Sequence, residues 1–169
     1  MTQEPVLVTY GSKRGGTAEI AQWIGESLRG EHIATEVLPA AEVREVSGYR
    51  AFVIGGSLYI GFWHRDARRF TRRFARRLGE QPVWLFGSGP LDDSADTPDG
   101  GAKVLGAKAV RKAAERVGAR SWTIFGGRLE RTARGFPASA MAKSSAGDFR
   151  DRDRIHAWAK SIAAELGQG

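Results

Sequence analysis

Residues 6–21 read VLVTYGSKRGGTAEIA and carry the main signal for the fold. An apolar run, residues 6–8, leads into a loop of small and polar residues, and a helical pattern begins at Thr17. A buried strand that passes through a glycine-rich loop into a helix is typical of the first βα unit of a parallel sheet. The loop amides and the helix N-terminus of such a unit can bind an anion, and the hydroxyls of Ser12 and Thr17 add donors. The stretch therefore predicts a phosphate-binding loop.

The rest of the chain repeats this alternation of strand and helix. Short apolar runs alternate with longer amphipathic ones, and residues 51–54 are continuously apolar, as in a strand buried on both faces. The expected strands are residues 5–10, 33–38, 51–55, 82–86 and 121–126. The expected helices are residues 17–29, 66–78, 103–117 and 152–166, with a short or irregular helix in 40–48. The pattern predicts an α/β protein with five parallel strands and helices on both faces of the sheet.

The composition is that of one folded domain. The chain has 169 residues, of which 41% are apolar and 27% charged, so it can build a single core and we expect one domain over residues 1–169. It contains no Cys, which excludes a disulfide framework, a thiolate metal site and a cysteine nucleophile. No basic segment precedes the first apolar run, and no apolar run approaches ~18 residues. We therefore expect a cytoplasmic protein.

One segment carries most of the net charge of +7, because seven Arg between residues 65 and 80 stand against Asp66 and Glu80. Apolar residues at helical spacing predict that this helix buries one stripe and exposes its arginines. The stripe is Ala67, Phe70, Thr71, Phe74, Ala75 and Leu78, and the exposed face is Arg68, Arg69, Arg72, Arg73, Arg76 and Arg77. Such a face can aid solubility, dock an acidic redox protein or contact an anionic membrane at its inner face. Nucleic acid is disfavoured, because no nucleic-acid-binding module accompanies the charge.

The loops that follow the strands form the candidate site, because ligands of an open parallel sheet bind beyond the carboxyl ends of its strands. The first loop, residues 11–17, lacks the Walker A lysine and a G-x-G-x-x-G pattern, which disfavours ATP and adenine dinucleotides. Its glycines would also serve a purely structural turn. The second loop, residues 56–61, offers Tyr59 as an aromatic platform. Phe62 and Trp63 would either extend this platform or pack against the start of the next helix. The third loop, residues 87–91, offers backbone groups.

The run from Val6 to Ala21 resembles the phosphate-binding signature of the flavodoxin family, (Thr or Ser)-x-Thr-Gly-x-Thr, which holds the phosphate of FMN. Ser12, Gly15 and Thr17 match it, whereas Arg14 places a cation where the family has a small hydroxyl residue. The resemblance implies a flavodoxin-like, doubly wound sheet in strand order 2-1-3-4-5, with noncovalent FMN or, as the alternative, a deazaflavin. The implied cofactor-binding residues are Ser12, Lys13, Arg14, Gly15, Gly16, Thr17, Ser57, Leu58, Tyr59, Ile60, Gly61, Ser88, Gly89, Pro90 and Leu91.

Further segments are similar to the flavodoxin-domain group that includes the menaquinone-dependent protoporphyrinogen oxidases. These segments are residues 54–57, the basic helix, residues 125–129, residues 147–151 and the last helix with its Trp158. The group has a longer, more apolar insertion before the last helix, whereas residues 130–146 are polar here. This resemblance implies a flavin-dependent oxidoreductase, protoporphyrinogen oxidase-like or quinone-linked, that acts on a small molecule or a quinone electron acceptor.

Two other functions stay open on the sequence. One is an electron-transfer flavodoxin that serves an acidic redox partner, and the other is a cofactor-free interaction module that uses the arginine helix. The three His lack the spacing of metal ligands, so no metal site is expected. His64 is a candidate for proton transfer or for orienting an anionic substrate, because it follows the proposed ring loop. The Asp residues at 92, 93, 96 and 99 are explained by turn chemistry.

Overall fold

The computed structural model describes residues 3–13, 15–129 and 147–167, and its centre is a parallel sheet. The five parallel strands are β1 (Val6–Gly11), β2 (Thr35–Pro39), β3 (Ala51–Tyr59), β5 (Val83–Ser88) and β6 (Ser121–Phe125). They lie in the order β2-β1-β3-β5-β6. Counted along the chain, this is second, first, third, fourth, fifth, so the doubly wound, flavodoxin-like order expected from the sequence is confirmed. The winding reverses between β1 and β3.

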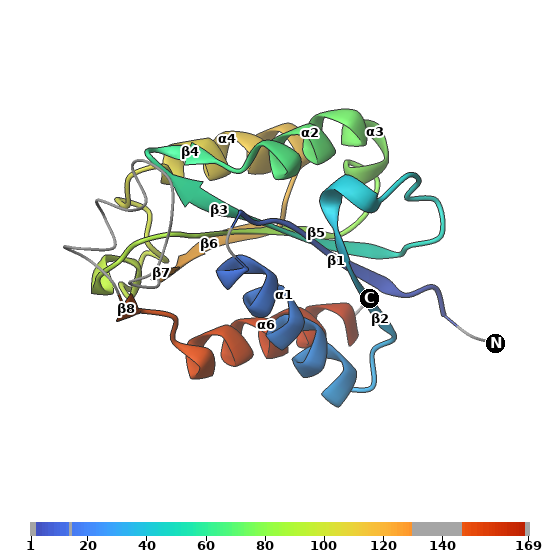
Figure 1. Ribbon diagram of the computed structural model, residues 1–169. Coiled ribbons are helices and arrows are strands. Elements are labelled where there is room, and N and C mark those ends of the chain that lie inside the picture. Colours follow the sequence, from blue (N-terminus) through green and yellow to red (C-terminus); the bar gives the residue numbers. More distant parts are fainter. Residues whose placement is uncertain (1–2, 14, 130–146, 168–169) are drawn as a thin grey trace.

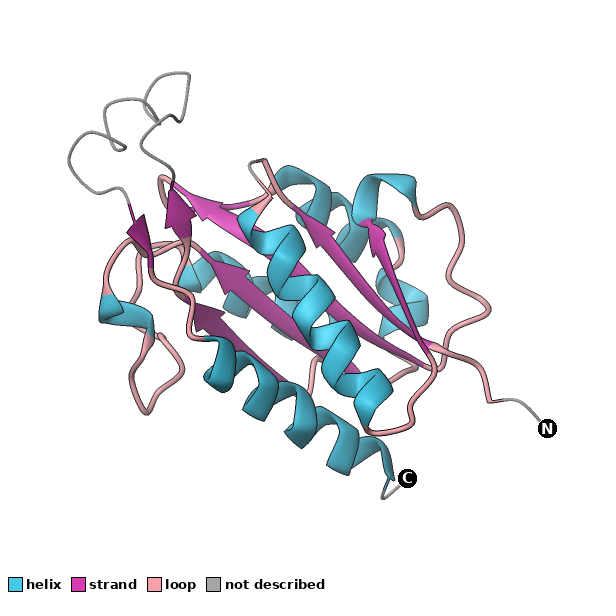
Figure 2. Ribbon diagram, turned by 60° about the horizontal axis from the view of Figure 1, so that its bottom comes forward, coloured by secondary structure: helices cyan, strands magenta, loops and turns pink. Residues whose placement is uncertain are grey.

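Helices cover both faces of the sheet (Figures 1 and 2). The lower layer in Figure 1 consists of α1 (Gly16–Gly30) and α6 (Arg152–Gly167). The upper layer consists of α2 (Arg65–Arg73), α3 (Ala75–Leu78) and α4 (Ala107–Val117), and two 3-10 turns, η1 (Ala40–Glu42) and η2 (Asp93–Ala95), lie in loops. None of the described helices is both long and apolar enough to cross a membrane.

Each helical layer has its own core, because successive strand residues point to opposite faces of the sheet. The upper core contains Leu7, Phe52, Ile54 and Leu85, which pack with Phe70 and Leu78. The lower core contains Val8, Val53, Trp84 and Phe86, which pack with Ile24, Leu28 and Ile162. All of these strand side chains are at most 1% exposed, which explains why the strands are continuously apolar in sequence.

The segment after β3 is a hairpin, where the sequence indicated only a loop. β3 continues to Tyr59 and then pairs antiparallel with β4 (Phe62–Trp63), with Tyr59 opposite Phe62. Ile60 and Gly61 form the two-residue turn, with φ of 48° and 77°. Two positive φ angles define a type I′ turn, for which Asn-Gly is the usual signal. The sequence did not predict this turn, because a β-branched residue such as Ile60 is unfavourable at a positive φ.

Three predicted helices differ from the structure in detail. The helix expected over residues 66–78 is distorted at Phe74, although the hydrogen bonds from Phe74 N to Phe70 O (3.1 Å) and from Leu78 N to Phe74 O (3.0 Å) carry the helical path across the distortion. The helix expected from residue 103 begins at Ala107. Residues 101–107 instead form successive tight turns, with hydrogen bonds from Val104 N to Gly101 O and from Ala107 N to Val104 O, both 3.0 Å. The short helix expected within residues 40–48 is reduced to η1.

Candidate functional site

A cavity of about 580 Å³ opens at the carboxyl edge of the sheet, between the ends of β1, β3, β5 and β6. Ten of the fifteen residues expected to hold a cofactor line it, namely Ser12, Lys13, Gly16, Thr17, Ser57, Leu58, Tyr59, Ser88, Gly89 and Leu91. Gly15, Ile60, Gly61 and Pro90 belong to the same loops but do not line the cavity. Arg14 lies outside the described residues. The three loops singled out from the sequence thus meet around one space.

Seven further residues line the cavity: Phe62, Trp63, His64, Arg65, Arg68, Gly127 and Arg128. The first five come to the site because the β3–β4 hairpin folds the chain back and starts α2 at the cavity. From the sequence, Arg68 was expected on the solvated face of its helix, but it is half-buried. Gly127 and Arg128 come just after β6, the fifth parallel strand, and this position after a strand is the sequence signal that could have found them.

The first loop presents an uncapped helix N-terminus. The Ser12 hydroxyl accepts a hydrogen bond from the Gly15 amide (3.0 Å), and α1 begins at the next residue without a side-chain cap. The first amides of a helix have no partner within it, so those that follow Gly15 can bind an anion. Thr17, in the first turn, is 3% exposed and lines the cavity. The loop therefore has the geometry of a phosphate site.

Glu19 lies close to this helix N-terminus, where its carboxylate would repel an anion, but two arginines neutralise it. Its Oε1 lies 3.3 Å from an Arg128 nitrogen and 2.9 Å from an Arg150 nitrogen. The Arg150 side chain is only 4% exposed, and it also donates to the Gly16 carbonyl (3.2 Å) and to Asp148 (2.7 Å). The hydrogen bonds that Arg150 donates to the Asp148 carboxylate hold the pKa of Asp148 below its usual value. Arg150 therefore supports the first turn of α1 and balances the charge of the Glu19 carboxylate.

The cavity wall is cationic. Lys13, Arg65, Arg68 and Arg128 line it, and none of its described lining residues is Asp or Glu. The Nε of Arg68 is buried and has no hydrogen-bond partner among the described residues. A buried N–H without a partner is costly unless a ligand accepts its hydrogen bond. Charge and hydrogen bonding both favour an anionic ligand.

His64 caps α2 and is neutral near pH 7. Its Nδ1 accepts the Asp66 amide hydrogen (3.0 Å), and the ring packs so closely on β1 that a Cβ at Gly11 would lie 2.5 Å from Nδ1. Burial lowers the pKa of His64, and the neighbouring cations add to the effect, whereas Asp66 opposes it. Because Nδ1 is an acceptor, the neutral ring carries its proton on Nε2. The cavity wall therefore includes a neutral imidazole.

The hairpin side of the cavity is apolar. It is lined by Leu58, Tyr59 and Phe62, whereas Leu91 lines the cavity from the loop after β5. The Lys13 ammonium lies 5.4 Å from the centre of the Tyr59 ring. Trp63 is fully buried and donates from Nε1 to the Phe86 carbonyl (3.1 Å), so it forms the floor rather than a stacking surface. A flat apolar ring can lie against this side.

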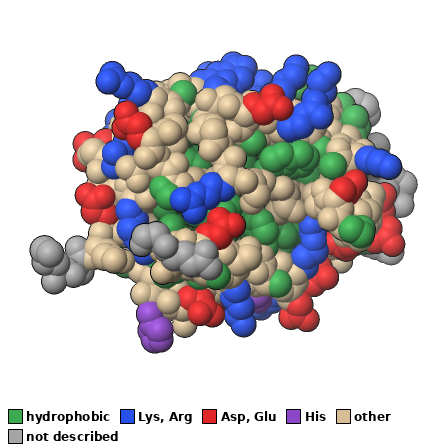
Figure 3. All heavy atoms as spheres, turned by 180° about the vertical axis from the view of Figure 1, so that it is seen from behind, with side chains coloured by type: hydrophobic (Ala, Val, Ile, Leu, Met, Phe, Trp, Pro, Cys, Tyr) green, Lys and Arg blue, Asp and Glu red, His purple; other side chains and the backbone are tan. Residues whose placement is uncertain are grey.

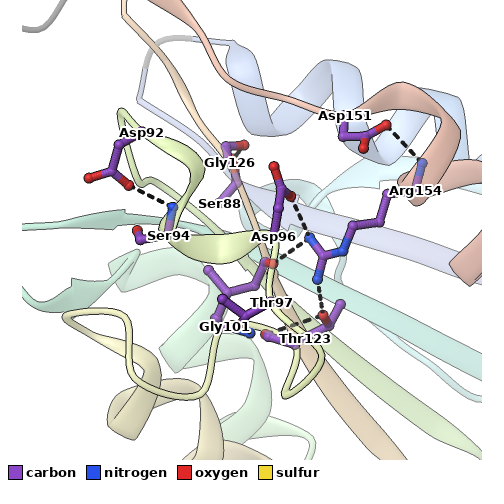
Figure 4. Close-up of polar contacts among 12 residues, drawn as sticks. Ser88, Asp92, Ser94, Asp96, Thr97, Gly101, Thr123, Gly126, Asp151 and Arg154 are labelled. Atoms are coloured by element: carbon purple, nitrogen blue, oxygen red, sulfur yellow. Dashed lines mark hydrogen bonds and ion pairs between the residues drawn. The ribbon is translucent and has the colours of Figure 1, made fainter.

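Hydrogen bonds hold the loops after β5 and β6 together. Ser88 donates to the Gly126 carbonyl (3.0 Å), and the Gly127 amide donates to the Pro90 carbonyl (2.8 Å). Figure 4 shows Arg154 reaching from α6 to Thr123 at 3.0 Å, and to Asp96 of the long loop after β5 at 3.4 Å. Arg154 of α6 in the lower helical layer therefore anchors β6 and the long loop after β5, next to the cavity.

Asp92 and Asp99 of the long loop serve local structure, whereas Asp96 pairs with Arg154 of α6. Hydrogen bonds from the Ser94 side chain and from the Ser94 amide (2.9 Å) lower the pKa of Asp92, and Asp99 accepts the Gly101 amide (3.2 Å). In the described part of the chain, no three His, Cys, Asp or Glu side chains gather as a metal site would require. The turn chemistry expected from the sequence accounts for the contacts of Asp92 and Asp99.

Comparison with known proteins identifies the family. The model of the flavodoxin domain matches residues 7–139. Among solved structures, a flavodoxin from Pseudomonas aeruginosa shares 18% identity at a TM-score of 0.61, over 96% of this chain and 99% of that one. A flavodoxin from Streptococcus pneumoniae shares 16% identity at a TM-score of 0.62, over 95% and 98%.

A larger protein has the same fold in part of its chain. Rubredoxin oxygen:oxidoreductase from Desulfovibrio gigas shares 14% identity at a TM-score of 0.66, over 98% of this chain but only 37% of its own. No curated protein matches the sequence. At these identities the solved structures show the fold alone, whereas the family model spans most of the chain. The chain belongs to the flavodoxin domain family.

Proposed function

We propose that the cavity binds FMN noncovalently and that the protein is a flavin-dependent redox protein. One observation carries the proposal: an uncapped helix N-terminus, with hydroxyls at Ser12 and Thr17, opens into a cavity whose described lining residues include four cations and no carboxylate. FMN combines a phosphate dianion with a flat apolar ring, and the cavity offers a complement to each. Membership of the flavodoxin domain family supports the same ligand.

Named groups of residues would hold each part of the cofactor. The phosphate would lie at residues 12–17, and the buried Arg68 Nε supplies a donor that an anion would satisfy. The ring would lie between the hairpin side, at Tyr59, and the loop at residues 88–91, where Leu91 lines the cavity. Lys13, which is exposed and lies over Tyr59, would have to move aside for the ring. Bound FMN would supply one- and two-electron redox chemistry.

The reaction proposed for this site is oxidation of a small molecule, of the protoporphyrinogen oxidase-like or quinone-linked kind. The resemblance of residues 54–57, 125–129 and 147–151 to that group supports it, as does the cationic wall, which suits an anionic substrate. His64, with a proton on Nε2 and a place in the wall, would move or hold a proton for such a substrate. Stopped-flow reduction with small quinones or porphyrinogens tests whether the protein turns over a small molecule.

A pair of substitutions at Ser12 tests FMN binding. Asn and Asp can both accept the Gly15 amide as Ser12 does, so both keep the turn. Only Asp adds a negative charge beside the expected phosphate. We expect Ser12→Asp to weaken FMN binding at least about tenfold and Ser12→Asn to change it by less than about threefold.

The titration is followed by quenching of flavin fluorescence, with circular dichroism to show that both variants fold. Equal affinities for the two variants would contradict a phosphate at this loop. Mass spectrometry of whatever molecule copurifies with the wild-type chain separates FMN from a deazaflavin. A colourless protein that does not quench added FMN would favour the cofactor-free interaction module.

A second candidate function is electron transfer to an acidic redox protein. The observation in its favour is the row of arginines that begins at the cavity with Arg65 and continues along α2 and α3. Stopped-flow reduction separates the two functions. Exchange with acidic redox proteins and no turnover of small molecules would favour the carrier.

A further inference from the structure

Three large apolar side chains are exposed on the β3–β4 hairpin and beside its turn, next to the cavity. They are Ile60, Phe62 and Leu105, which are 60%, 64% and 76% exposed. Leu105 lies against the hairpin turn, since a Cβ at Gly61 would come 3.5 Å from its Cδ1. Phe62 also lines the cavity. We call these three residues the apolar tip.

Ile60 is strained, and the described structure does not compensate the strain. Its φ of 48° lies in the left-handed region, which is unfavourable for a β-branched residue. Asn would suit this type I′ turn better, and Ile60 gains little from burial because it is mostly exposed. Strain that folding does not require often marks a functional contact. We therefore infer that the exposed side chain of Ile60 contacts an apolar partner outside the chain.

A broad basic surface adjoins the apolar tip. The three helices of the upper layer contain eleven Lys and Arg against two acidic residues, Asp66 and Glu115. Figure 3 shows basic side chains gathered along the top edge of the molecule, where Figure 1 places these helices. Among the described residues, Arg69, Arg72 and Arg76 make no ion pair with a carboxylate. The layer therefore has uncompensated charge for an anionic partner.

We propose that the protein docks on an anionic lipid bilayer, with the apolar tip inserted among the lipids and the upper layer facing the headgroups. Apolar side chains beside a basic helical face are the combination that holds proteins at membrane interfaces. A protein interface would more often place its apolar residues at the centre of a polar rim, whereas the tip lies at one end of the basic layer. Because Phe62 belongs to both tip and cavity, docking turns the cavity mouth toward lipid-soluble substrates.

Flotation with vesicles tests the docking. The purified chain is mixed with phosphatidylcholine vesicles that either contain or lack phosphatidylglycerol. We expect binding to the anionic vesicles, weakened by salt, and much weaker binding to the neutral ones. The measurement does not require bound flavin, so it fails or succeeds independently of the proposed function. Absence of binding to anionic vesicles would overturn the proposal, and capture of an acidic redox protein instead would assign the surface to that partner.

Ile60→Asn separates docking from folding. It relieves the turn strain, so we expect the melting temperature to rise by about 2–4 °C. It also removes an inserted side chain, so we expect binding to anionic vesicles to fall about tenfold. A role in folding alone would not combine a more stable protein with weaker binding. Unchanged vesicle binding in Ile60→Asn would contradict insertion of the tip.

A matched pair of double variants tests the charges. Arg69→Gln with Arg72→Gln removes two positive charges from the upper layer, and Arg152→Gln with Lys160→Gln removes two from α6 in the lower layer. We expect the first variant to bind anionic vesicles at least about tenfold more weakly and the second to bind as the wild type does. Equal losses would show that only net charge matters and would overturn the proposed orientation.

Discussion

The two helical layers both cover a buried core, but their solvent-exposed surfaces differ in charge. Both bury a core of apolar side chains against the sheet. The lower layer, α1 and α6, has four basic and four acidic residues, whereas the upper layer has eleven and two. Burial of a core sets no requirement on the sign of the solvent-exposed charges. The fold therefore does not account for the charge of the upper layer, and the proposed docking on an anionic bilayer would use it.

The layers also differ in how their charges are paired. In the lower layer, Glu19, Glu26 and Glu165 each lie within 4.0 Å of at least one arginine nitrogen. In the upper layer, the ion pairs of the described residues join near neighbours in the sequence, such as Arg111 and Glu115. The two ion pairs of Glu19 thus lie at the first turn of α1, whereas the upper layer keeps arginines, such as Arg72, that make no ion pair with a carboxylate among the described residues.

The largest effect on stability is expected from substitutions in the two cores, and we expect the loss to be similar in both. Leu28 of α1 and Leu78 of α3 are both fully buried, one in each core. We expect Leu28→Ala and Leu78→Ala each to lower the free energy of unfolding by about 2–5 kcal/mol, through lost burial and the cavity left behind. Urea denaturation measures both. A loss well below 1 kcal/mol at Leu78 alone would mean that the upper layer contributes little to the fold.

A smaller effect is expected from single arginines, and here the layers should differ. Arg150→Met removes a nearly buried guanidinium that bonds Glu19, Asp148 and the Gly16 carbonyl, so we expect a loss of about 2–3 kcal/mol. Arg72→Met, on the exposed upper face, should change stability by less than about 0.5 kcal/mol. Denaturation of the two variants side by side checks the contrast. Equal losses would refute the distinction between paired and uncompensated arginines.

The smallest effect concerns pH and His64. Its pKa is lowered in the folded chain, so below the unfolded pKa of about 6.5 the unfolded state binds more protons and stability falls as the pH falls. Asn at this position can still accept the Asp66 amide but does not titrate. We therefore expect His64→Asn to lose less stability than the wild type between pH about 7.5 and about 5. Parallel pH profiles would show that His64 is not a buried neutral group.

Much of this architecture could be read from the sequence, because its signals are local. Continuous apolar runs located the five parallel strands, and the stretch around Ser12 and Thr17 located the first loop of the cavity. The basic segment from residue 65 indicated an amphipathic helix with the correct buried residues at Ala67 and Phe70. Periodicity and turn residues suffice wherever a segment's own sequence decides its structure.

The rest depended on tertiary contacts. The hairpin at Ile60 lacks the usual turn residues, so its strand β4 and the return of Arg65 and Arg68 to the cavity could not be foreseen. The neutralisation of Glu19 depends on Arg128 and Arg150, each more than a hundred positions further along the chain. No local pattern encodes such pairings, because they arise only when the sheet and the lower layer have formed.

The most direct test of the proposed cofactor site compares FMN with riboflavin, which has the same ring and no phosphate. The purified chain is titrated with each, and flavin fluorescence is followed. We expect one FMN to bind per chain and to bind at least about a hundredfold more tightly than riboflavin, because the first turn of α1 and the cationic wall act on the phosphate. Equal affinity for the two flavins, or no binding of FMN, would contradict the proposed site.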